Sequence, residues 1–241
     1  MSMIEILPFI STAIMLGFTI YVFQRYFVRH SLPFLFWGVG LAMFGLGSFA
    51  EVYLSLAWSR AVFVMWYLFG AILNPAWIGQ GTLYLLVKRR WVHVVSGILI
   101  LASLASAALM LSIPINDSGF HLGTPISEQY KAIIPSASFN LILIPTIIFG
   151  TVGLILLVGG ALYSAFLFWR KRVLPNRVIG NVLIAAGALS VASASELTHL
   201  GYGQYLYIGE LLAAVLMFFG FLTAARPQPD EAPQAVVVAA D

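Results

Sequence analysis

The chain has 241 residues, of which 61% are hydrophobic and only 9% are charged, and its mean hydropathy is +0.97. Soluble globular domains carry about 25% charged residues, so this composition excludes a soluble domain. The net charge of +3 is small. The absence of cysteine excludes disulfides and thiolate metal sites.

Apolar runs long enough to cross about 30 Å of hydrocarbon recur along nearly the whole chain. The backbone must satisfy its own hydrogen bonds in lipid, and the runs show no two-residue alternation, so we expect helices. The sequence therefore predicts an all-α membrane protein, a seven-transmembrane helix bundle. The predicted spans are residues 4–27, 32–54, 58–87, 92–113, 136–169, 176–200 and 204–225.

Two segments lie outside these spans. Residues 114–135 are rich in turn-forming residues and are predicted to form a long connection between the fourth and fifth spans. Residues 227–241 are rich in proline and alanine and cannot bury a core, so we expect a short disordered cytoplasmic tail. The predicted domain organisation is a seven-helix domain over residues 1–226 followed by this tail.

The positive charges are distributed unevenly between the two sets of loops. Ten of the twelve Lys and Arg residues follow the first, third, fifth and seventh spans, whereas Arg60 and Lys131 lie at the opposite ends. Basic residues concentrate in the cytoplasmic loops of membrane proteins. The pattern predicts an N-terminus outside, a C-terminus in the cytoplasm and a multi-pass location in the cell (inner) membrane.

Ionisable side chains at membrane depth are rare and by default indicate a functional site. Several such residues are predicted to lie at a similar height near the outer loops, and Glu196 and His199 share a helix face at spacing i, i+3. Three interpretations stay open: charges that reach the interface, with Arg60 neutralising a carboxylate; a pocket for a small ligand, a cation or a proton; and a metal site. The candidate ligand-binding residues are Glu51, Arg60, Asn74, Glu196, His199 and Glu210.

Asn74 belongs to this set because Pro75 follows it in the middle of the third span. A proline there frees a backbone carbonyl and kinks the helix, and the kink could form the floor of the pocket. Asn140 and Asn181 are predicted to be buried amides that form hydrogen bonds between helices. Runs of Gly, Ala and Ser in the second, fifth and sixth spans predict close helix packing, with a ligand channel as the alternative.

A shift of 145 residues superposes residues 47–51 on residues 192–196, including the two glutamates. The match is the basis for a possible parallel repeat, with the first three spans related to the last three and the fourth as a connector. Such a repeat would favour a transport protein.

Parts of the second and third spans, FWGVGLAMFGLGSFAEVYLSL and RAVFVMWYLFGAILNPAWIGQGTLYLL, resemble the seven-transmembrane N-terminal sensor region of bacterial histidine kinases. The resemblance covers about fifty residues, and its matching positions are Trp37, Glu51, Tyr67, Gly70, Pro75 and Trp77. It implies a sensor of a ligand or of stress that faces outward. These 241 residues contain no kinase domain, so we expect any signal to pass to a separate partner.

The sequence contains no phosphate-binding loop and no serine or histidine catalytic set, so no enzymatic activity is predicted. The seventh span has no lysine for a retinal Schiff base, and no cofactor or metal is predicted. The leading hypothesis is a sensor- or receptor-like membrane protein with an outward-facing polar pocket. The alternatives are a small transporter or ion-coupled carrier built on a 3+1+3 repeat, and an accessory subunit of a larger membrane complex.

The expected partners follow from the same features. They are the lipid bilayer, a small ligand or cation from outside, and a protein partner or anionic lipid at the cytoplasmic basic loops. No nucleic-acid partner is expected.

Overall fold

The computed structural model describes residues 3–226, and the predicted tail, residues 227–241, lies outside the described residues. Within the described chain, seven helices are long and apolar enough to cross a membrane. Five are continuous: α1 (Met3–Arg29), α2 (Leu32–Leu56), α5 (Trp91–Ser112), α9 (Pro175–His199) and α10 (Tyr205–Ala224). The other two contain a π-helical segment: α3 (Arg60–Met65), η1 (Trp66–Leu73) and α4 (Asn74–Leu86), and then α7 (Ser136–Leu154), η3 (Ile155–Gly159) and α8 (Gly160–Arg170).

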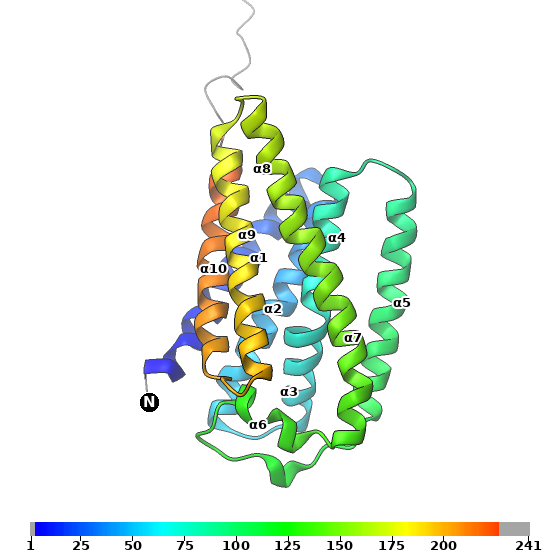
Figure 1. Ribbon diagram of the computed structural model, residues 1–241, viewed down its shortest axis with the longest axis vertical. Helices are drawn as coiled ribbons and strands as arrows, with labels where there is room; N and C mark the ends of the chain where they lie inside the picture. Colours follow the sequence, from blue (N-terminus) through cyan, green and yellow to red (C-terminus); the bar gives the residue numbers. More distant parts are fainter. Residues whose placement is uncertain (1–2, 227–241) are drawn as a thin grey trace, which may run out of the picture.

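These helices stand side by side in one bundle, with α5 at its edge (Figure 1). Large apolar side chains cover the outside of the bundle, including Leu16, Leu101 and Ile155, which are each more than 60% exposed. Such exposure suits a hydrocarbon solvent and not water. The prediction of an all-helical membrane fold with seven spans is confirmed.

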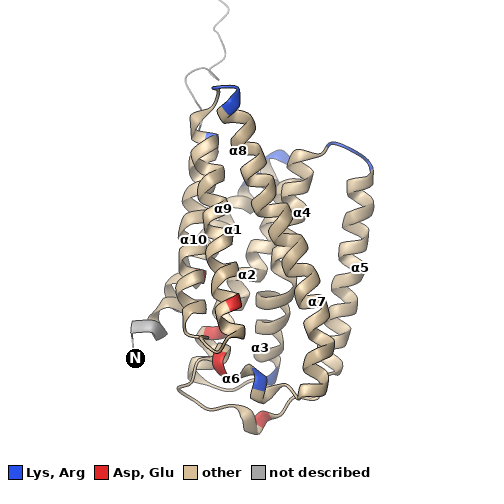
Figure 2. Cartoon of the chain, viewed as in Figure 1, with Lys and Arg blue, Asp and Glu red and all other residues tan. Residues whose placement is uncertain are grey.

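The charged residues separate to the two ends of the bundle (Figure 2). We call the end that carries residues 25–29, 88–90 and 170–177 the basic end. The opposite end, which carries Glu51, Glu196 and Glu210 near the helix termini, is the acidic end. The described chain begins at the acidic end and finishes at the basic end, as an odd number of spans requires.

The connection at residues 114–135 is more regular than the sequence predicts, because it contains η2 (Asp117–Gly119) and α6 (Ile126–Ile133). Ile126, Tyr130 and Ile133 recur at i, i+4 and i+7, and all three are buried against the bundle. Gln129 holds the preceding loop: it donates to the carbonyl oxygens of His121 and Thr124 and accepts from the His121 N–H. This amphipathic spacing is present in the sequence and indicates a helix at α6, although the turn-forming residues around it favour a loop.

The third span contains its π-helical segment just before the proline at which the sequence predicts a kink, and a side chain donates to two carbonyls there. Asn74 Nδ2 donates to Phe69 O at 2.9 Å and to Gly70 O at 2.6 Å. Pro75 has no N–H for Gly70 O, which lies five residues before it as the π-helical register requires, and the Asn74 amide supplies a donor to that carbonyl. Asn74 therefore stabilises the junction between η1 and α4.

The other two amides differ from each other. Asn181 donates to Ser164 Oγ at 3.0 Å and joins α9 to α8, as the prediction of an interhelical hydrogen bond requires. Asn140 is exposed, so the prediction of a buried amide there is wrong. A pattern of apolar neighbours does not reveal which side of a helix faces its partners.

We expect Asn74→Ala to lower the free energy of unfolding by about 1–3 kcal/mol, because it removes the side-chain donor of two carbonyls at the junction of η1 and α4. Asn140→Ala makes the same chemical change at an exposed position and should stay within about 0.5 kcal/mol of the parent. Thermal unfolding in detergent, followed by circular dichroism, compares the two. Equal effects of both substitutions would contradict the role given to Asn74.

Glycines bring the helices close together, which supports packing as the use of the small-residue runs. A Cβ at Gly153 of α7 would clash with the backbone of Pro75 and Ala76, and one at Gly47 of α2 would lie 2.8 Å from Gly70 Cα. In lipid, where little hydrophobic drive acts between helices, such close approach allows the van der Waals contact that holds them together.

Gly153→Ala should therefore destabilise the protein by about 1–3 kcal/mol, since the added methyl group meets rigid backbone. Gly150 is the matched control on the same helix, because a Cβ there has no neighbour within 4 Å. Gly150→Ala should be neutral or stabilise by up to about 1 kcal/mol through helix propensity. The measurement is the same thermal unfolding series, and a neutral Gly153→Ala would contradict the close contact of α7 with α4.

Candidate functional site: a buried carboxyl pair

Two buried carboxyl groups meet between α2 and α10. Glu51 lies five residues before the end of α2 and Glu210 five residues after the start of α10, so each lies about 8 Å inside the acidic end at 1.5 Å per residue. Glu51 is 2% exposed and Glu210 is 7% exposed. Their carboxyl groups interact directly with each other. The structure thus brings together two carboxylates that lie at opposite ends of the sequence.

Each carboxyl group also accepts a hydrogen bond from a neutral donor. Trp66 Nε1 donates to Glu51 Oε1 at 3.0 Å, and Ser48 Oγ donates to Glu210 Oε2 at 3.1 Å. Ser48 and Glu51 share one face of α2 at spacing i, i+3. The other oxygen of Glu51, Oε2, is fully buried and has no donor among the described residues. A proton or a ligand would satisfy this oxygen.

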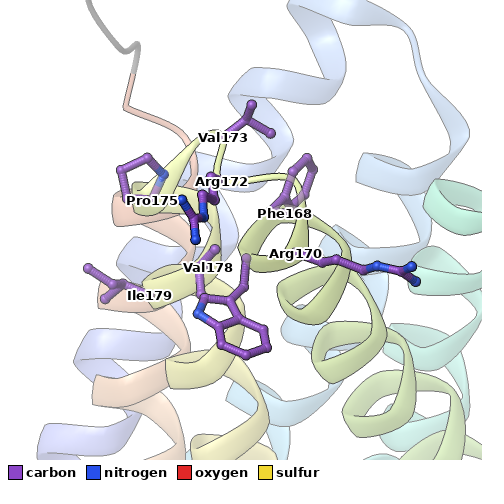
Figure 3. Close-up of a pocket in the computed structure, with 8 residues that line it drawn as sticks. Phe168, Arg170, Arg172, Val173, Pro175, Val178 and Ile179 are labelled. Carbon is purple, nitrogen blue, oxygen red and sulfur yellow. The ribbon is translucent and has the colours of Figure 1, made fainter.

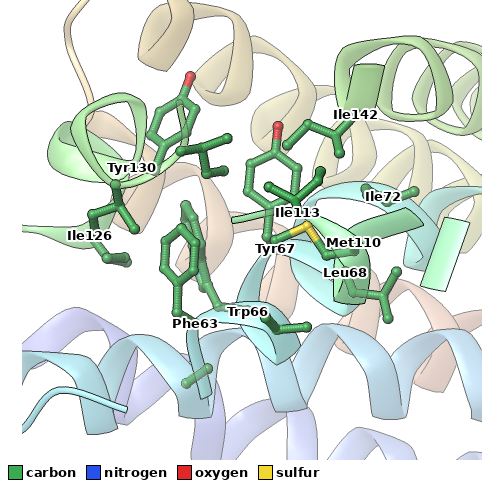
Figure 4. Packing of buried hydrophobic residues seen from close by; sticks show 14 of the residues in the cluster. Phe63, Trp66, Tyr67, Leu68, Ile72, Met110, Ile113, Ile126, Tyr130 and Ile142 are labelled. Carbon is green, nitrogen blue, oxygen red and sulfur yellow. The ribbon is translucent and has the colours of Figure 1, made fainter. Parts of the chain in front are cut away.

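Trp66 connects the pair to a small cavity. The cavity has a volume of about 50 Å³, and Trp66, Tyr67, Tyr130 and His199 are among its lining residues. The rings of Trp66, Tyr67 and Tyr130 lie 5.9–6.1 Å apart between centroids. Figure 4 shows the hydroxyl groups of Tyr67 and Tyr130 pointing in the same direction, away from Phe63. The indole of Trp66 therefore contacts the cavity with its ring and the carboxyl pair with its N–H.

Helix α6 closes this region at the acidic end. Tyr130 Oη lies 3.2 Å from His199 Nδ1, and Lys131 Nζ donates to His199 O at 3.1 Å. Burial raises the pKa of Tyr130 to about 12, so its hydroxyl stays neutral at physiological pH. A neutral hydroxyl donates to an unprotonated Nδ1 and accepts from a protonated one. The Tyr130 hydroxyl can therefore act as donor or acceptor in the contact between α6 and α9.

The structure also adds a contact on α10. Tyr207 is 5% exposed, and its hydroxyl interacts with Ser127 and with the backbone of Ile126 in α6. Ser127 Oγ in turn donates to Gly203 O at 3.0 Å. These contacts fix the start of α10, one turn before Glu210, against the surface helix.

The six residues proposed from the sequence fall into three groups. Glu51 and Glu210 form the pair, and His199 lines the neighbouring cavity. Arg60 donates to Ile113 O at 3.3 Å, and Asn74 binds the carbonyls of its own helix. Glu196 is exposed on α9, so the i, i+3 relation with His199 does not bring its carboxylate to the pair.

Sequence reasoning missed Ser48, Trp66 and Tyr130 as parts of this region. Ser48 carried a usable signal, since it lies three residues before a membrane glutamate. Trp66 and Tyr130 carried none, because an aromatic residue in an apolar span or a loop is ordinarily packing. Among the described residues, no three His, Cys, Asp or Glu side chains group in a way that would hold a metal ion.

The fold and this pair define a multi-pass helical membrane protein with a buried acidic site near one end of its bundle. Comparisons of the chain with protein-family models, with curated proteins and with solved structures give no match. Inferences about function therefore depend on the geometry of this chain.

The raised pKa of Tyr130 predicts an alkaline loss of stability. Tyrosine has a pKa of about 10 in an unfolded chain, whereas Tyr130 in the folded protein has one of about 12, so the unfolded state binds fewer protons between these values. Stability should fall as the pH rises from about 10 to about 12, and Tyr130→Phe should make this fall smaller. The measurement is the thermal unfolding midpoint in detergent between pH 9 and 12.

Tyr202→Phe is the matched control, because Tyr202 is 56% exposed in the connection between α9 and α10. It should leave the alkaline fall unchanged. An identical pH profile for Tyr130→Phe and the parent protein would show that the Tyr130 hydroxyl is not shielded from water.

Proposed function

We propose that this protein is a sensor- or receptor-like membrane protein without catalytic activity, which detects protons or a small cation at its acidic end. In this proposal the protein lies in a bacterial inner membrane. Its acidic end faces outward and its basic end faces the cytoplasm. The distribution of Lys and Arg supports that orientation, because the basic end carries ten of the twelve. The signal would pass to a separate protein through the loops of the basic end.

One observation carries the proposal: the continuous contact from the cavity through Trp66 to the carboxyl pair. Two carboxylates that face each other away from water repel strongly unless they share a proton or hold a cation. Glu51 Oε2, which lacks a donor, is the atom that would bind it. A change in occupancy would alter the contact between α2 and α10, and α10 runs from this site to the basic end.

The size of the cavity decides the class of ligand. Pockets for organic ligands measure about 300–1,000 Å³, whereas this one measures about 50 Å³. One water molecule occupies about 30 Å³ of liquid volume, so the space suits a water molecule or a small ion. The ionisable groups around the path are Glu51, Glu210, His199 and the tyrosines at positions 67, 130 and 207. The other hydroxyl groups are those of Ser48, Thr146, Ser195 and Thr198.

The test uses the full chain in lipid nanodiscs, with protons, Na⁺ and K⁺ as probes and tryptophan fluorescence as the readout. A pH titration between 4 and 8, repeated at fixed pH with each salt, should change the emission of Trp66, assigned by comparison with Trp66→Phe. Glu51→Gln and Glu210→Gln should each abolish the response, because they remove a charge of the pair while keeping the shape of the side chain.

Glu196→Gln is the control, since it makes the same change at an exposed glutamate, and the response should persist. The same proteins in liposomes loaded with a pH dye should give no proton flux. Flux that Glu210→Gln abolishes would replace the sensor with the ion-coupled carrier. Absence of any response to protons or either cation would overturn the proposal, and purification with a stoichiometric partner would favour the accessory subunit.

A further inference from the structure

A wide groove lies at the basic end, far from the carboxyl pair, where α8 ends and α9 begins. Its volume is about 570 Å³, which is within the range of pockets that hold organic ligands. The two arginines that line it are Arg170 and Arg172. Figure 3 shows Arg172 beside Pro175 and Val178, whereas the guanidinium of Arg170 reaches to the opposite side.

The groove has a polar part and an apolar part. Trp169 is 68% exposed and Ile179 is 54% exposed, although both are large apolar side chains. Val178 and Ile179 lie three and four residues after Pro175, about 5 Å further into the bundle along the axis of α9. The arginines therefore mark the end of the bundle, and the apolar wall continues toward its middle. A lipid molecule has the same order, with a charged headgroup followed by hydrocarbon chains.

The length of the helices places the groove at headgroup depth. Helix α9 has 25 residues, which at 1.5 Å per residue give about 38 Å. The hydrocarbon layer is about 30 Å thick, so the ends of α9 extend into the headgroup layers. Exposed tryptophan is typical of this boundary.

The turn that forms the groove has an unusual backbone. Arg172 and Leu174 both have positive φ values, of 52° and 55°, although neither is glycine. Left-handed conformations of this kind cost energy, and the surrounding structure must hold them in place. Here they bend the chain sharply enough for Arg172 to face the first turn of α9. The backbone of the turn therefore sets the direction in which the Arg172 side chain leaves the chain.

We propose that this groove binds one anionic phospholipid of the adjacent leaflet, with its phosphate at Arg172 and its acyl chains along Val178 and Ile179, while Arg170 adds positive charge on the opposite side of the same turn. Guanidinium groups bind phosphate oxygens in a planar, bidentate manner, which gives the site its preference for a phosphate. An anionic lipid such as phosphatidylglycerol carries no ammonium group to neutralise its phosphate, and this distinguishes it from a zwitterionic lipid. The site is independent of the proton or cation sensing proposed above.

The experiment measures the quenching of Trp169 by brominated lipid in nanodiscs made with the full chain. Trp169→Phe identifies the signal of this residue among the six tryptophans. At equal mole fraction, brominated phosphatidylglycerol should quench Trp169 more than brominated phosphatidylcholine. The double variant Arg170→Gln, Arg172→Gln should reduce this preference by about fivefold for each arginine removed, the value expected for a basic residue at an anionic surface.

The matched control is Lys88→Gln, Arg89→Gln, which removes the same charge from another loop of the basic end. It should leave the preference at Trp169 intact, and circular dichroism should show equal helix content in both double variants. Equal quenching by the two lipids, or an equal loss in the control, would overturn the proposal.

Two further probes separate the other sources of negative charge. Inorganic phosphate and a short polyglutamate peptide are added to the protein in neutral nanodiscs, and neither should change the emission of Trp169. A saturable response to phosphate would assign the groove to a soluble anion. A saturable response to the peptide would assign the groove to an acidic protein partner. Either result would overturn the proposal that the groove binds a lipid.

Discussion

The contact between Glu51 and Glu210 is the constraint on which the acidic half of the bundle depends. Two carboxyl groups removed from water are tolerated only if each oxygen finds a proton, a donor or a cation. Ser48 and Trp66 supply donors to two of the oxygens, and Glu51 Oε2 has none among the described residues. The pair therefore depends on the relative positions of α2, η1 and α10, which carry the two carboxyl groups and their donors.

Small residues next to the pair make this arrangement possible. Gly47, four residues before Glu51, packs on Gly70, and Gly209, just before Glu210, packs against Ala194 and Ser190 O. Ser190 Oγ donates to Gly209 O at 3.1 Å and adds a polar contact between α9 and α10. A larger side chain at either glycine would separate the helices that carry the carboxyl groups. The glycines therefore act on the site through helix spacing.

The edge of the bundle uses polar contacts in a different way. Helix α5 is held to α4 by Gln80 Nε2, which donates to Ser96 Oγ at 2.8 Å, and by Trp77 Nε1, which donates to Ser103 Oγ at 3.1 Å. Hydrogen bonds between spans replace the hydrophobic drive that lipid does not provide. The two ends of the protein thus have separate chemistry: a buried acidic pair at the end that carries α6, and an open groove with two arginines at the other.

The sequence by itself determined the number of spans, the helical class and the end that gathers the basic residues, because each depends on the composition of a window of about twenty residues. It also placed Glu51 and Glu210 near one end. Only the tertiary structure decided which carboxylates meet, because hydropathy does not report the rotation of a helix about its own axis. Close packing with α10 turns Ala194 and Thr198 of α9 inward, which leaves Glu196 exposed although it lies between them in the chain.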